Sequence, residues 1–93
     1  MNRPEPMLDK VKLIKIMTEN LPMLRKRLEL TQEEIADKIG VSRSTVIAIE
    51  NNKREMTWNT FLSLMLLFSK NESTNKILSI LDLNTEEFNE FMR

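Results

Sequence analysis

The stretch QEEIADKIGVSRSTVIAIEN, residues 32–51, predicts two short helices joined by a tight turn. Gly40 is the only glycine in the chain, and it stands between the two helices, where a residue that tolerates a positive φ is needed. Ala36 supplies a small side chain where the helices cross. The apolar residues fall at the spacing of two inward faces: Ile35, Ile39, Val41, Val46 and Ile49. Because these features agree, a helix-turn-helix is favoured over an ordinary helical hairpin.

Apolar residues at helical spacing continue on both sides of this stretch, and no segment alternates as a strand does. Residues 1–7 predict a flexible arm, and residues 8–93 a single helical domain. Asn20 and Pro22 predict a break between two early helices. We therefore expect an all-α fold of about seven helices: 8–19, 21–28, 32–39, 43–50, 58–68, 74–82 and a short last one.

Short polar residues mark the predicted helix starts. Thr31 and Glu34 form a capping box, in which each side chain can satisfy a free amide. Ser42, Thr57 and Thr85 stand at the other N-cap positions.

Composition argues against several classes of function. The 93 residues include no cysteine and no histidine, so the chain lacks disulfides, thiolate ligands and the commonest general base. We expect no enzyme activity, no cofactor and no metal. No long uncharged apolar run predicts a membrane span, and the N-terminus lacks the apolar region of a signal peptide, so we expect a cytoplasmic protein.

The formal net charge is zero, which by itself argues against nucleic-acid binding. The charges are unevenly distributed, however, because the last third of the chain is acidic and the rest is slightly basic. Basic residues cluster at the two edges of the helix-turn-helix: Arg25, Lys26, Arg27, Lys53 and Arg54. A local basic rim of this kind is enough to contact phosphates.

Four features carry a family resemblance: LRKRLELTQEEIA at 24–36, IGVSRSTV at 39–46, AIENNKR at 48–54, and an apolar segment at 58–68. Together, residues from about 21 to 68 resemble the Cro/repressor helix-turn-helix family, also called lambda-repressor-like or XRE. The resemblance implies a lambda-repressor-like helix-turn-helix bundle, here with additional N- and C-terminal helices, and double-stranded DNA as the ligand.

In this family the second helix of the motif lies in the major groove. The resemblance then places six residues at the base edges: Ser42, Arg43, Ser44, Thr45, Ile47 and Ala48. Arg43 is the strongest candidate, because a guanidinium can bond guanine O6 and N7 together. Ile47 and Ala48 are expected on an exposed face, where they suit thymine methyl groups.

The resemblance also assigns phosphate contacts and one structural pair. Gln32, at a helix N-terminus, and three loop residues are expected to contact DNA phosphates: Asn52, Lys53 and Arg54. Arg25 and Glu50 match positions that the family often pairs, and we expect a partly buried ion pair there. Two positions depart from the family, because Asn52 and Glu29 stand where glycine is common.

We expect a sequence-specific transcriptional regulator, a repressor acting as a homodimer. The alternatives are the antitoxin of a toxin–antitoxin pair, with a protein partner, and a protein-interaction module that no longer binds DNA. The wide apolar faces of 8–19 and 74–92 fit either the core or a dimer interface.

Overall fold

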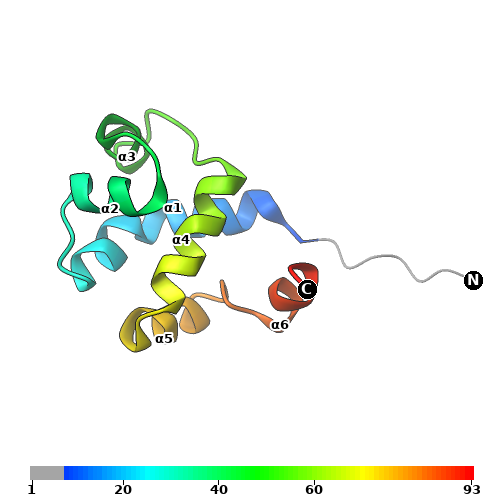
Figure 1. Ribbon diagram of the computed structural model, residues 1–93. Helices are drawn as coiled ribbons and strands as arrows, with labels where there is room; N and C mark the ends of the chain where they lie inside the picture. The colour runs from blue at the N-terminus through cyan, green and yellow to red at the C-terminus, as the bar shows by residue number, and fades with distance from the viewer. Residues whose placement is uncertain (1–7) are drawn as a thin grey trace, which may run out of the picture.

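The computed structural model describes residues 8–93, which form six helices and contain no strand (Figure 1). The bounds of the helices are α1 Lys10–Arg27, α2 Gln32–Ile39, α3 Arg43–Glu50, α4 Trp58–Ser69, α5 Glu72–Ile80 and α6 Glu86–Phe91. The predicted all-helical class is therefore confirmed. The arm predicted at 1–7 lies outside the described residues.

The first helix corrects one prediction, because α1 runs unbroken through Pro22, where we expected two helices. A proline inside a helix removes a hydrogen bond and strains the turn before it, at a cost of about 3 kcal/mol. The buried stripe of α1 explains why the helix continues: it passes across the proline as Leu13, Met17, Leu21 and Leu24. Burying four large side chains on one face outweighs the local cost. The count of helices falls to six for the same reason.

The two helices of the motif have the predicted bounds. Thr31 and Glu34 make both hydrogen bonds of the capping box, at 3.0 and 2.9 Å. Gly40 adopts φ +75°, and nothing lies within 4 Å of the place where a Cβ would stand. The turn therefore requires the backbone conformation of glycine and not its small size. Ser42 then caps α3 by accepting a hydrogen bond from the amide of Thr45 at 3.1 Å.

One cluster of buried apolar side chains draws on all six helices. In Figure 1, α1 and α4 cross in the middle, α2 and α3 lie together at the upper left, and α5 and α6 lie below. The fully buried side chains include Leu24 of α1, Ile35 of α2, Ile49 of α3, Phe61 of α4 and Leu78 of α5. The helix-turn-helix therefore rests on α1 and α4 as a fixed support.

The fifth helix begins earlier and ends earlier than the predicted range of 74–82. Asn71 caps it by accepting from the amides of Ser73 and Thr74, at 2.9 and 3.2 Å. Thr74 is fully buried, and its hydroxyl donates to the carbonyl of Phe68 at 2.6 Å. This bond joins the start of α5 to the end of α4.

The last helix is attached through aromatic side chains. Phe88 of α6 is buried and meets Trp58 and Phe61 edge-on, with ring centroids 6.5 and 6.0 Å away. Lys10 at the start of α1 places its ammonium 4.9 Å from the Trp58 ring and 5.3 Å from the Phe91 ring. These contacts fix α6 beside the N-terminal ends of α1 and α4.

Three helices end on a residue other than glycine in the left-handed conformation: Glu29, Asn52 and Asp82, with φ of 57°, 58° and 59°. At the end of α1 the amide of Glu29 donates to the carbonyl of Lys26 at 2.9 Å, and the next amide reaches five residues back at 3.2 Å. The ends of α3 and α5 repeat this pattern, which is the Schellman motif. Glu29 and Asn52 stand where the family often has glycine, and both adopt the left-handed conformation that these turns need.

The wide apolar faces noted in the sequence lie mainly in the core, through Leu13, Met17, Leu78 and Phe88. Several large apolar side chains nevertheless remain outside: Val11, Met23, Leu66, Ile80, Phe91 and Met92. Within residues 8–93, no helix has both the length and the apolar character needed to cross a membrane.

Candidate DNA-binding surface

The N-terminal turn of α3 faces solvent. Ser42, Arg43 and Ser44 are exposed. Ile47 and Ala48, expected on an exposed face, are half-buried. The most exposed part of α3 is therefore its first turn, where two serine hydroxyl groups and the guanidinium of Arg43 lie together.

The hydroxyl groups of this turn are linked to one another. Ser42 Oγ lies 3.0 Å from Ser44 Oγ and 2.8 Å from Thr45 Oγ1, besides accepting from the Thr45 amide. Because the Ser42 hydroxyl is engaged in capping, Ser44 and Arg43 are the side chains of this turn best placed to reach a ligand.

The opposite face of α3 is held inside the protein. Val46 and Ile49 are buried, with 1% and 2% of their surface exposed. They pack in the same core as Ile35 and Ala36 of α2. The outward turn of α3 is therefore presented in a fixed orientation relative to α2.

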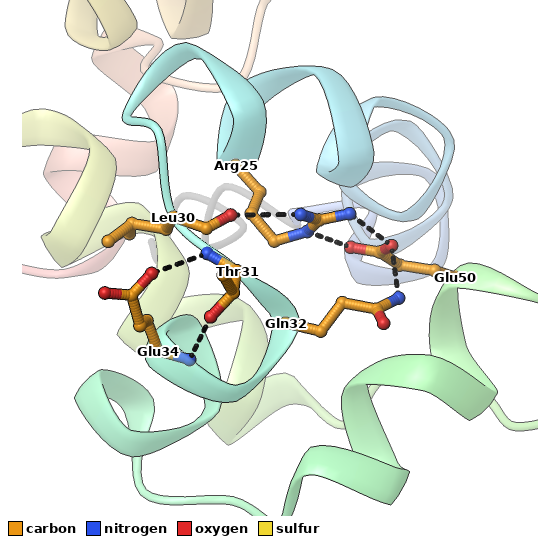
Figure 2. Close-up of polar contacts among 6 residues, drawn as sticks. All are labelled: Arg25, Leu30, Thr31, Gln32, Glu34 and Glu50. Carbon is orange, nitrogen blue, oxygen red and sulfur yellow. Dashed lines mark hydrogen bonds and ion pairs between the residues drawn. The ribbon is translucent and has the colours of Figure 1, made fainter.

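A polar network ties the end of α3 to the two preceding helices, as Figure 2 shows. Arg25 donates from Nε to Glu50 Oε2 at 2.9 Å and from Nη2 to Oε1 at 3.0 Å. Gln32 donates from Nε2 to the same Oε1 at 3.0 Å, and Arg25 also donates from Nη1 to the carbonyl of Leu30 at 3.0 Å. The two side chains that the sequence paired are thus in contact, and Gln32 joins them.

This ion pair is a buried one, because the side chains of Arg25 and Glu50 are 11% and 6% exposed. Burial acts to raise the pKa of Glu50, but hydrogen bonds from Arg25 and Gln32 and the charge of Arg25 outweigh it and lower that pKa below its ordinary value. The hydrogen bonds that Arg25 donates to Glu50 likewise raise the pKa of Arg25. Both groups therefore stay charged at neutral pH.

The loop after α3 is anchored to the helix by its backbone. The amide of Asn52 donates to the carbonyl of Ile49 at 3.1 Å, and the amide of Lys53 donates to that of Ala48 at 2.8 Å. The side chains of Asn52, Lys53 and Arg54 are exposed. The backbone bonds therefore hold the loop in place, with the side-chain amide of Asn52 and the two cationic side chains exposed.

Two contacts in this region were not foreseen from the sequence. Gln32, expected at a phosphate, donates one of its two amide hydrogens to Glu50, which leaves the second for another acceptor. Arg54, in the loop after α3, donates from Nη1 to Oγ1 of Thr45, the third residue of that helix, at 3.3 Å. No pattern in the sequence signals this second contact, because it depends on the turn that the left-handed Asn52 makes.

The loop also borders a groove. A cavity of about 510 Å³ lies between α1 and the loop, lined on one side by Val11, Ile14 and Lys15 and on the other by Lys53 and Arg54, among others. Among residues 8–93, acidic side chains form no cluster suited to a metal ion.

Helices α1, α2 and α3 form one unit, in which the ion pair of Arg25 and Glu50 holds α3 on α1 and the polar first turn of α3 is exposed. This arrangement is that of a helix-turn-helix domain. Residues 23–57 match the helix-turn-helix family. These residues therefore belong to that family, and the match supports the predicted resemblance to the Cro/repressor type.

Three curated relatives agree with this assignment. The chain is 32% identical over 69 residues to the uncharacterized HTH-type transcriptional regulator YqaE of Bacillus subtilis, an alignment that covers 67% of this chain and 60% of the relative. It is 55% identical over 29 residues to an uncharacterized HTH-type transcriptional regulator of Methanothermobacter thermautotrophicus, covering 31% of this chain and 42% of the relative. It is 51% identical over 37 residues to the uncharacterized HTH-type transcriptional regulator MJ0272 of Methanocaldococcus jannaschii, covering 40% and 56%.

The chain thus spans less than two thirds of the length of each of these relatives. No solved structure matches the chain with statistical significance.

Proposed function

We propose that this protein is a sequence-specific DNA-binding transcriptional regulator, a repressor that binds operator DNA as a homodimer. One observation carries the proposal: the polar first turn of α3 is exposed on a helix whose other face is buried and whose end is locked to α1 and α2. A helix held in this way can enter a major groove without rearrangement.

Base recognition in this proposal begins with Arg43. Its guanidinium is exposed at the first position of α3 and has the shape to bond guanine O6 and N7 together. Ser44 adds a hydroxyl beside it, and Ser42 and Thr45 shape the turn through their shared hydrogen bonds. Ile47 and Ala48 lie one turn further, where their exposed parts meet thymine methyl groups.

Phosphate contacts hold the helix in register. Gln32, at the first position of α2, has an amide hydrogen beyond the one given to Glu50 and sits where the helix dipole favours an anion. Asn52 and Lys53 contact the phosphates of the DNA on the far side of the recognition helix. Arg54 shares their loop, but its side chain lies against α3.

Pairing supplies the affinity that one copy lacks. A formal net charge of zero gives weak attraction to DNA over distance, so a single copy would bind weakly. Two copies on successive major grooves, about 34 Å apart, would double the contacts and read both halves of a symmetric operator. A dimer occupying such a site would block transcription, which is the role of a repressor. The role also places the protein in the cytoplasm with the DNA.

The test measures binding to an operator that the wild-type protein has selected, using three alanine variants. Arg43→Ala should lower affinity for the operator by about 1–3 kcal/mol per half-site and relax the preference for one base. Lys53→Ala should weaken binding to all sequences alike and reduce the salt slope by about one unit. Lys70→Ala is the matched control, because Lys70 is an exposed lysine at the end of α4, away from the motif.

An unchanged affinity and base preference in Arg43→Ala would show that α3 does not read the bases. A change of base preference in Lys53→Ala would contradict its role at a phosphate.

The zero net charge favours a second candidate, a protein-interaction module that no longer binds DNA. An antitoxin with a protein partner would combine DNA binding with protein binding. Retention on heparin or on non-specific DNA at low salt separates the DNA-binding candidates from the interaction module. A protein that is not retained supports the interaction module.

A further inference from the structure

The side chain of Arg54 turns back along the recognition helix. Arg54 follows the C-terminal end of α3, yet its Nη1 donates to Oγ1 of Thr45, the third residue of that helix, at 3.3 Å. A guanidinium from the loop is therefore carried to the turn that is exposed for base contacts.

The backbone that carries Arg54 is fixed. Asn52 stands in the left-handed conformation, and the amides of Asn52 and Lys53 both donate to carbonyls in the last turn of α3. Because the residue just before Arg54 is bonded to the helix, the direction in which Arg54 leaves the loop is set by the fold.

The acceptor is fixed as well. Thr45 Oγ1 lies 2.8 Å from Ser42 Oγ, and Ser42 Oγ also accepts from the backbone amide of Thr45. The threonine hydroxyl therefore has one position, determined by the cap of α3, at which to receive the arginine.

This contact engages Nη1 and leaves the edge formed by Nε and Nη2. That edge presents two parallel donors, the arrangement that bonds guanine O6 and N7 together. Phosphate oxygens also accept from these two donors, so the choice between base and phosphate rests on position. Thr45, which accepts from Arg54, belongs to the first turn of α3, and this position favours a base contact over the phosphate contact expected from the sequence.

We propose that Arg54 is a second specificity-determining residue, which bonds a guanine in the major groove beside the base pairs met by the first turn of α3. Thr45 acts through Arg54 as the residue that positions its guanidinium. The inference rests on the proposed function, since it requires the first turn of α3 to lie in the groove.

The test compares the sequences that the full chain and three variants select from random DNA. Arg54→Lys keeps the charge but removes the paired donors, so it should lose one guanine preference, by roughly 5- to 150-fold, while the salt slope stays the same. Thr45→Val removes the acceptor and should weaken the preference at that same base pair. Thr45→Ser keeps the hydroxyl and is the matched control, which should select the wild-type sequence.

The outcomes test the role of Arg54 separately from the proposed DNA-binding function. Selection of the wild-type sequence by Arg54→Lys would overturn the inference and leave the proposed function standing. A loss of preference in Arg54→Lys that Thr45→Val does not share would overturn the positioning role of Thr45. A wild-type protein that selects no sequence would overturn the proposed function itself. Circular dichroism of each variant tests whether the substitutions at Arg54 and at the half-buried Thr45 leave the fold intact.

Discussion

Glu50 brings three helices together at a single carboxylate. It ends α3 and accepts hydrogen bonds from Arg25 of α1 and Gln32 of α2. The side chain of Glu50 is 6% exposed and that of Arg25 is 11% exposed, so loss of either member of this ion pair leaves the other charge unpaired in the interior. The orientation of α3, the proposed recognition helix, therefore depends on a residue outside the proposed base-contacting set.

Removing one member of this pair should destabilise the protein strongly. Glu50→Gln and Arg25→Met should each lower the free energy of unfolding by about 3–5 kcal/mol, because each leaves a buried partner uncompensated. The double variant should lose less than the sum of the two. Urea denaturation followed by circular dichroism measures all three values.

The exposed pair of Lys76 and Glu72 offers a matched control. Its atoms are 3.6 Å apart and the side chains are 73% and 88% exposed, so Lys76→Gln should change stability by less than about 0.5 kcal/mol. Strictly additive losses at Arg25 and Glu50 would contradict the view that they act as a pair.

At the scale of the element, the ends of the helices show which features a sequence reveals. The chain has one glycine, and it correctly predicts the turn between α2 and α3. The same left-handed conformation ends α1 and α5 on Glu29 and Asp82, which carry no such signal. The bounds of α2 and α3 follow from their caps, which are local. The missed features depend on tertiary packing: the stripe that carries α1 across Pro22, and the contact of the Arg54 guanidinium.

A carboxylate residue in a left-handed position is strained, and relieving the strain should stabilise the protein. Glu29→Gly should raise the free energy of unfolding by about 0.5–1 kcal/mol, because glycine adopts this conformation without steric cost. Thermal unfolding measures the change. Lys15→Gly, at an exposed position inside α1, is the control and should lower stability by about 1 kcal/mol. A loss of stability at position 29 would show that the Glu29 side chain makes a stabilising contact that outweighs its backbone strain.

At the scale of the whole molecule, the core explains why the motif is presented rigidly. The helix-turn-helix shares its buried side chains with α1 and α4, and the aromatic contact of Phe88 with Trp58 adds α6 to the same cluster. Trp58 begins α4, directly after the loop that carries Lys53 and Arg54. The C-terminal helices therefore pack on α1 and α4, the two helices on which the helix-turn-helix rests. From this placement we propose that residues 8–93 act as one unit.

The distribution of charge belongs to the same scale. The acidic last third of the chain includes α5 and α6, which lie away from α3 in Figure 1. The basic loop residues stand beside α3. A protein without net charge can thus present a locally basic surface to DNA, at the expense of attraction over distance.

The measurement that tests the central claim most directly is selection of bound sequences from a random pool of double-stranded DNA by the full chain. The account predicts an enriched inverted repeat whose half-sites are centred about 10–10.5 base pairs apart and contain a guanine that Arg43→Ala no longer selects. A pool that stays random after repeated selection, or an enriched sequence that Arg43→Ala selects equally well, would contradict it.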